Sequence, residues 1–198
     1  MSAITVPLPG APAAWKLPYR GTVGMACLII AESSIFTIFV IAYLYYAGKS
    51  LSGPTPREVL ETPIFGTICL LSSSLTVHFA TRLLHSGRRG GFLTLWLLTI
   101  LLGSIFIAGT AQEWHRLIYG RGLTISTNLF GTTYYSLVGL HATHVIAGLI
   151  MLSVVYLFGL AGRVGQEQAG RAEVLALYWH FVDAVWVVVF SVVYLIAR

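Results

Sequence analysis

The chain has 198 residues, of which 57% are hydrophobic and only 10% are charged, and its formal net charge is +5. A soluble domain carries about 25% charged residues, so this composition excludes an ordinary soluble protein, a disordered chain and a disulfide scaffold. It indicates an integral membrane protein. The two cysteines, Cys27 and Cys69, lie in apolar runs, and we expect both to be small buried side chains.

Five segments are long and apolar enough to cross a hydrocarbon core of about 30 Å. They cover about 23–47, 63–84, 92–111, 129–160 and 174–197. This pattern predicts an all-α fold, an integral membrane bundle of five transmembrane helices, in which residues 23–198 form a single domain. Residues 1–22 hold four of the seven prolines and lack the apolar core of a signal peptide. They predict an extended N-terminal arm.

The loop charges favour a cytoplasmic N-terminus, because cytoplasmic loops carry an excess of Lys and Arg. The basic residues that then face the cytoplasm are Lys16, Arg20, Arg82, Arg88, Arg89, Arg163 and Arg171. The remaining five of the 12 basic residues face the other side. Among the cytoplasmic group, Arg20, Arg82 and Arg171 are candidate contacts for lipid headgroups. We expect no nucleic-acid surface on so apolar a chain.

Glu32 is an ionisable residue deep in the first span, about nine residues or 14 Å from its start. Its neighbours Ser33, Ser34 and Thr37 are polar as well. Ionisable groups at this depth are costly and face other helices or a cavity. Two interpretations remain open. Glu32 is either a proton-relay or gating carboxylate, or a protonated carboxylic acid that is hydrogen-bonded between helices.

Further histidines and carboxylates lie in the other spans at helical spacing: His78, Glu113, His141, His144, His180 and Asp183. His141 and His144 share one helix face, and His180 and Asp183 repeat that geometry. Such a set on packed helices is compatible with a metal site and hence with a free-standing membrane metalloenzyme. Transmembrane His and Asp also form hydrogen bonds between helices without metal.

Aromatic and small residues surround these positions. Tyr178 and Trp179 are interpreted as part of an aromatic belt at the membrane interface. Trp186 lies deeper and predicts helix packing or a hydrogen-bond donor inside the bundle. Gly139 and Gly148 flank the histidines of the fourth span and allow close helix approach.

Several segments resemble subunit III of the haem-copper oxidases. GMACLIIAESSIFTIFVIAYLYY is similar to its Glu-bearing helix, and LFGTTYYSLVGLHATHVIAGLIML to its Gly-x-His-x-x-His-Val helix. AEVLALYWHFVDAVWVVVFSVVYLIAR resembles its last helix, whose Tyr-Trp-His-Phe-Val-Asp-x-Val-Trp run is highly specific. The likeness runs in order over about 23–198 and fits the five-helix bacterial form. Longer members have seven spans and a lipid-filled cleft.

The resemblance implies a non-catalytic subunit of a proton-pumping cytochrome c oxidase in aerobic respiration, placed in the bacterial inner membrane. It would stabilise subunit I and support proton uptake. It implies no catalytic or metal-binding residue and no redox centre in this chain. Haem and copper would lie in partner subunits I and II, cytochrome c would donate electrons, and phospholipid would bind. The alternatives are subunit III of a quinol oxidase, the membrane metalloenzyme, and a small transporter gated by Glu32.

The residues that match the family's patterns are Glu32, Glu113, His141, His144, Glu173, Tyr178, Trp179, His180, Asp183 and Trp186. For the polar members and Trp186, the resemblance implies proton-uptake support or a buried polar network. One departure is visible. Thr81 and Arg82 stand where many members have adjacent histidines, with His78 one turn earlier.

Overall fold

A computed structural model describes residues 20–50 and 53–196. Its long helices are α1 (Arg20–Tyr46), α3 (Ile64–His85), α4 (Arg89–His115), α5 (Leu129–Leu160) and α6 (Ala169–Phe190). A short helix α2 covers Pro56–Val59, a 3-10 turn covers Gln166–Gln168, and π-helical turns cover Arg116–Gly120 and Ser191–Ile196. Five helices are long and apolar enough to cross a membrane, and the described residues hold no strand. The predicted all-α, multi-pass membrane fold is confirmed.

Several helix boundaries differ from those expected from hydropathy, most of all the end of α4 and the start of α6. α1 begins at Arg20, and the rest of the predicted arm, residues 1–19, lies outside the described residues. α4 and its π-helical turn run on to Gly120, and α6 begins at Ala169. Both extensions are polar sequences that continue the helix beyond its apolar stretch. Hydropathy indicates the part of a helix that lies in hydrocarbon. The backbone hydrogen bonds of the helix can continue beyond that part.

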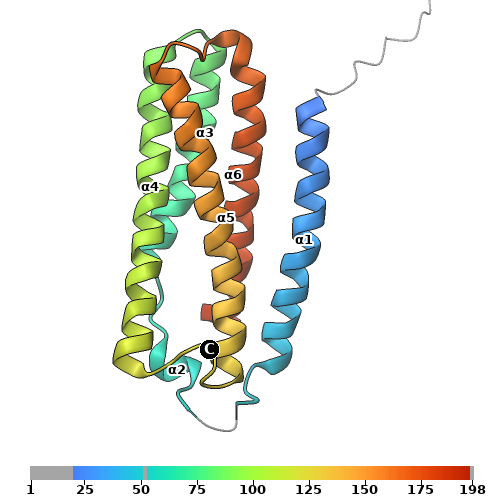
Figure 1. Cartoon of the computed structure of the whole chain (residues 1–198), viewed down its shortest axis with the longest axis vertical. Helices are drawn as coiled ribbons and strands as arrows, with labels where there is room; N and C mark the ends of the chain where they lie inside the picture. The colour runs from blue at the N-terminus through green and yellow to red at the C-terminus, as the bar shows by residue number, and fades with distance from the viewer. Residues whose placement is uncertain (1–19, 51–52, 197–198) are drawn as a thin grey trace, which may run out of the picture.

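Four helices form a closed bundle, and the fifth lies outside it. α3 packs against α4 and α6, and α5 packs against the same two helices, so α3 and α5 are diagonal to each other. α1 packs mainly against α5 and α6, and Figure 1 shows it standing beside the bundle. The helix that carries Glu32 is therefore the least embedded of the five.

Trp179 fills the centre of the four-helix bundle. It is fully buried on α6, and its indole N–H donates to the Ser73 hydroxyl of α3 at 2.8 Å. Gly103 of α4 and Gly148 of α5 lie against the indole ring, where an added Cβ would come within 2.9 Å and 2.7 Å of ring carbons. One side chain thus contacts all three neighbouring helices, and the close packing expected at Gly148 is confirmed.

The aromatic-belt interpretation of Tyr178 and Trp179 is wrong, since both side chains are buried. The Trp179 side chain is enclosed by α3, α4 and α5 and does not face lipid headgroups. Trp186 behaves as predicted. It is buried and donates its N–H to the Thr67 hydroxyl at 3.1 Å.

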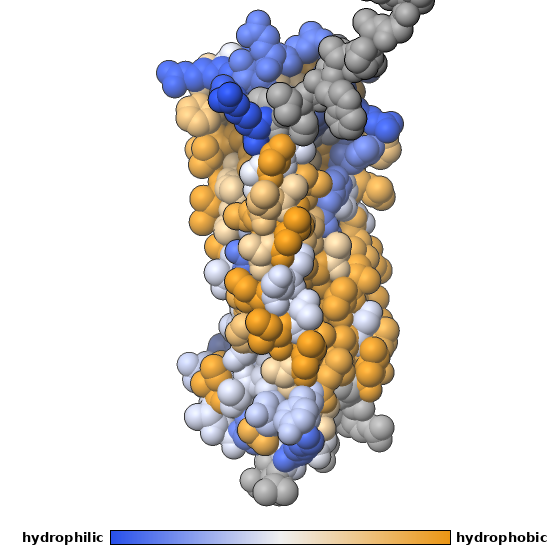
Figure 2. Space-filling model, turned by 90° about the vertical axis from the view of Figure 1, so that its right-hand side faces the viewer, coloured by the Kyte–Doolittle hydropathy of each residue, from blue (hydrophilic) through white to orange (hydrophobic). Residues whose placement is uncertain are grey.

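The face of the molecule in Figure 2 is largely apolar between two more polar ends. Exposed apolar side chains occur on every long helix. Cys69 is buried as predicted, but Cys27 is exposed, so that part of the cysteine prediction is wrong. The physical reason is that α1 contacts the bundle along one side only, which leaves its other side open to lipid or to a partner.

The packing around Trp179 gives a stability prediction. Gly103→Ala places a methyl group where the space is occupied by the indole, and we expect it to lower the free energy of unfolding by about 1–3 kcal/mol. The matched control is Gly109→Ala on the same helix, where a Cβ meets nothing within 4 Å. Thermal unfolding of the purified chain in detergent compares the two variants, and equal stability would contradict the central role of Trp179.

Candidate functional site

The polar residues singled out from the sequence do not meet in one place. Glu32 joins α1 to α5, His180 joins α6 to α3, and Glu113 lies with tyrosines at the far end of α4. His141 is buried without a hydrogen bond to any described residue, and the buried Asp183 carboxyl group lies beside the Ser74 hydroxyl. The candidate site is therefore a series of separate contacts, of which the Glu32 contact joins α1 to α5.

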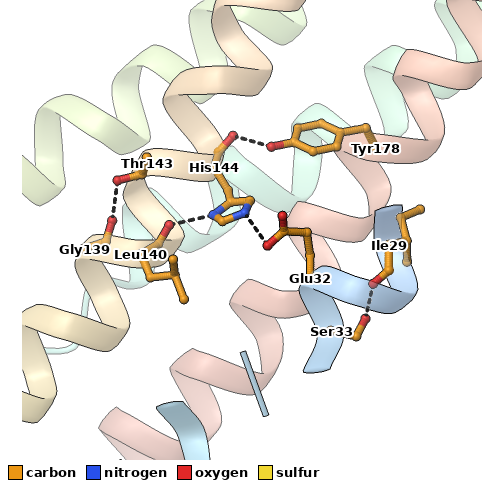
Figure 3. Close-up of polar contacts among 8 residues, drawn as sticks. All are labelled: Ile29, Glu32, Ser33, Gly139, Leu140, Thr143, His144 and Tyr178. Atoms are coloured by element: carbon orange, nitrogen blue, oxygen red, sulfur yellow. Dashed lines mark hydrogen bonds and ion pairs between the residues drawn. The ribbon is translucent and has the colours of Figure 1, made fainter. Parts of the chain in front are cut away.

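Glu32 and His144 form the contact between α1 and α5 (Figure 3). The Glu32 Oε2 atom lies 3.2 Å from His144 Nε2, and the two side chains are 26% and 15% exposed. The other ring nitrogen of His144, Nδ1, donates to the Leu140 carbonyl at 2.8 Å. That second bond fixes the imidazole orientation, as hydrogen bonds to histidine commonly do.

This geometry fixes the number of protons in the pair. A carbonyl oxygen only accepts, so Nδ1 of His144 must carry a hydrogen. The contact between Nε2 and the Glu32 carboxyl group then needs one further hydrogen. Either the carboxylic acid donates to a bare Nε2, or an imidazolium donates to a carboxylate. Both arrangements hold one mobile proton and no net charge, which suits a medium of low dielectric constant.

A cavity of about 300 Å³ adjoins the pair between α1, α5 and α6. Its lining is mostly apolar: Met25, Leu28, Glu32, Thr143, His144, Ala147, Met151 and Tyr178. The Tyr178 hydroxyl donates to the His144 carbonyl at 3.1 Å (Figure 3). The third helix of the site is thereby fixed to the backbone that carries the imidazole.

The histidines and aspartate of α5 and α6 have different surroundings. His180 Nδ1 lies 2.6 Å from the Ser74 hydroxyl of α3, and this hydroxyl also lies beside the buried Asp183 carboxyl group. The fully buried His141 ring stacks on Trp186, with 5.0 Å between ring centroids. Within the described part of the chain, no group of three or more His, Cys, Asp or Glu side chains could hold a metal ion.

Glu113 belongs to a buried cluster at the end of α4. It accepts hydrogen bonds from the hydroxyls of Tyr134 at 3.3 Å and Tyr194 at 3.2 Å. These two hydroxyls are 3.4 Å apart. The tyrosine partners were missed by sequence reasoning, because they lie in the fourth and fifth spans and carry no motif. Their only signal is a phenol in an apolar helix, which needs a partner when buried.

Glu173 lies at the opposite end of the bundle and is half-exposed, so it is not part of a buried network. Its carboxylate lies 2.6 Å from His85 Nε2, and the two side chains are 56% and 47% exposed. This end also carries the exposed residues Arg20, Arg82 and Arg171, and Figure 2 shows it as strongly hydrophilic. We call it the basic end of the bundle.

Comparison with known proteins identifies the family. The family model for cytochrome c oxidase subunit III matches residues 20–198. The chain belongs to this family. It is thus a membrane subunit of a multi-subunit oxidase complex and has partner subunits. All of the contacts described above lie within the matched residues.

Relatives cover most of the chain. Cytochrome c oxidase subunit 3 of Corynebacterium diphtheriae is 39% identical, over 93% of this chain and 92% of its own length. The subunit of the same name from Synechocystis is 35% identical, over 87% of this chain and 74% of its own length. The cytochrome bo(3) ubiquinol oxidase subunit 3 of Pseudomonas aeruginosa is 36% identical, over 85% and 78% respectively.

Proposed function

We propose that the chain is the non-catalytic subunit III of a proton-pumping cytochrome c oxidase in a bacterial inner membrane. In this role it stabilises subunit I and supports proton uptake. Subunits I and II hold the haem and copper, and cytochrome c supplies the electrons. The observation that carries the proposal is the family match over residues 20–198, which includes the polar contacts between helices described above.

A second candidate is subunit III of a quinol oxidase. The ubiquinol oxidase relative is as similar to this chain as the cytochrome c oxidase relatives are, at 36% identity against 35% and 39%. Nothing in the chain is expected to contact the electron donor. The two candidates therefore share the same structural role and differ in the donor to the complex.

The first test is composition of the native complex. When the tagged chain is purified from its own membrane in mild detergent, we expect haem and copper to arrive with larger subunits. Metal analysis, haem spectra and mass spectrometry make the measurement, and the haem and donor activity separate the cytochrome c and quinol candidates. A chain that is purified alone and without haem would contradict the proposal, and bound metal on the isolated chain would favour the metalloenzyme.

We further propose that the Glu32–His144 pair supports proton uptake. Its one mobile proton lies beside a cavity at the joint between α1 and the bundle. Because the proton can lie on either the carboxyl group or the imidazole, the pair can accept and release a proton with little movement of the two side chains. Glu113, His141, His180, Asp183 and Trp186 are proposed to hold the helices in place around it.

Two substitutions separate the structural and the proton-transfer roles of Glu32. Glu32→Gln has no carboxyl proton to exchange but can still donate an N–H to His144 Nε2, so we expect unchanged thermal stability and slower turnover. Glu32→Ala loses the hydrogen bond as well, which should cost about 1 kcal/mol of stability. Ser34→Ala is the control, because Ser34 bonds only to its own helix at Ile30. Unchanged turnover, pumping and catalytic lifetime in Glu32→Gln would make the residue structural.

The basic end is proposed to face the cytoplasm and to hold an anionic phospholipid. A cavity of about 280 Å³ between the ends of α5 and α6 has an apolar lining that includes Val155 and Phe158, and Arg163 and Arg171 stand at it. The apolar lining would contact an acyl chain, and the two arginines would bind the phosphate of the headgroup. Arg20 and Arg82 are further headgroup candidates at the same end.

The lipid proposal predicts a charge-specific loss. In the purified complex we expect Arg163→Gln and Arg171→Gln each to weaken retention of anionic phospholipid about fivefold, since a basic residue near the surface contributes about 1 kcal/mol. Lipid mass spectrometry gives the ratio of anionic to zwitterionic phospholipid. Arg121→Gln, an exposed residue at the other end, is the control. An equal loss in all three variants would contradict the site.

A further inference from the structure

A polar patch lies on the outer face of α3 and α6. It consists of Ser74, His78 and His180, and we call it the histidine patch. His78 is exposed, and its ring centroid lies 6.3 Å from that of the half-buried His180. His180 Nδ1 is bonded to Ser74, whereas His78 makes ring contacts and no hydrogen bond with any described residue.

The histidine patch lies well inside the apolar part of both helices. His85 and Glu173 form an ion pair between the same two helices at the basic end. His78 and His180 each lie about two turns, or about 10 Å, further along their helices. An imidazole is too short to reach the membrane surface from that depth.

The residues around the patch are apolar and face outward. Leu71, Leu75 and Phe79 of α3 are 39%, 63% and 51% exposed. The buried Asp183 lies behind Ser74, on the inner side of the patch. The two histidines therefore form a polar spot in a face that would otherwise suit lipid.

Lipid alone is unsuited to contact the histidine patch. Hydrocarbon offers no hydrogen bonds, and polar groups at this depth face other helices or a water-filled cavity. A phosphate group would have to lie about 10 Å from its own layer to meet His78. Among the described residues, none of this chain covers the patch from outside.

We infer that the histidine patch is a docking surface for a transmembrane helix of a larger oxidase subunit. That helix presents a hydrogen-bonding side chain to His78 and His180. A neutral imidazole offers one donor and one acceptor, so a carboxylic acid or carboxamide, which also offers both, fits the two rings. The flanking leucines and Phe79 pack against the apolar part of the same helix. The inference rests on the proposed function, because it needs partner subunits.

The test uses photo-cross-linking in the intact complex. A photoreactive phenylalanine analogue replaces Leu75 in one variant and Ile150 in the other. Ile150 is a matched control, because it is 60% exposed against 63% for Leu75 and lies on α5, diagonal to α3. We expect the Leu75 variant to cross-link to a larger subunit of the complex, identified by mass spectrometry, and the Ile150 variant not to do so.

Substitution of His78 tests the polar contact itself. We expect His78→Leu to weaken retention of this chain in the complex about three- to thirtyfold in detergent, the range for an interhelical hydrogen bond in a membrane. His78→Gln keeps a donor and an acceptor and should retain most of the binding. Folding of each variant is checked by circular dichroism of the purified chain.

The outcomes separate the inference from the proposed function. If larger subunits never accompany the wild-type chain, the proposed function fails. If they do, but the Leu75 variant cross-links only to lipid or to a second copy of this chain, the docking inference alone is overturned. Equal retention of His78→Leu and wild type would overturn it as well.

Discussion

Hydrocarbon supplies no hydrogen bonds, and this constraint organises the whole structure. Polar side chains at membrane depth are placed where another helix meets them. The indole of Trp179 reaches Ser73, the indole of Trp186 reaches Thr67, and Glu32 reaches His144. Each of these contacts joins two different helices. In a membrane, where apolar side chains gain little by leaving lipid for protein, such contacts and close packing hold the bundle together.

The same constraint divides the chain into a tightly packed part and a loosely attached helix. The four-helix bundle closes around Trp179, which lies against two glycines and a serine from three helices. α1 lies outside it and meets α5 through the Glu32–His144 pair. The Glu32–His144 pair attaches α1 to the bundle and holds one proton that it can exchange. We propose that the oxidase uses this pair in proton uptake.

The sequence predicted the fold and the family well, and the pairing of residues poorly. Long apolar runs located all five spans, and the run from Tyr178 to Trp186 identified the family. The Glu32–His144 contact was not predicted, because its partners are far apart in the chain. These helices are apolar on nearly every side, so no amphipathic stripe indicates which face turns inward. Trp179 was misplaced for the same reason, because the sequence does not show that its side of α6 faces the centre of the bundle.

A structure of the chain within its purified native complex, in lipid, tests the central claim most directly. The claim is that polar groups at membrane depth are met by protein, inside the chain or across a subunit boundary. We predict that the Glu32–His144 contact persists and that His78 lies within hydrogen-bond distance of a polar side chain of a larger subunit. A structure in which His78 faces acyl chains and Glu32 lies away from His144 would contradict the account.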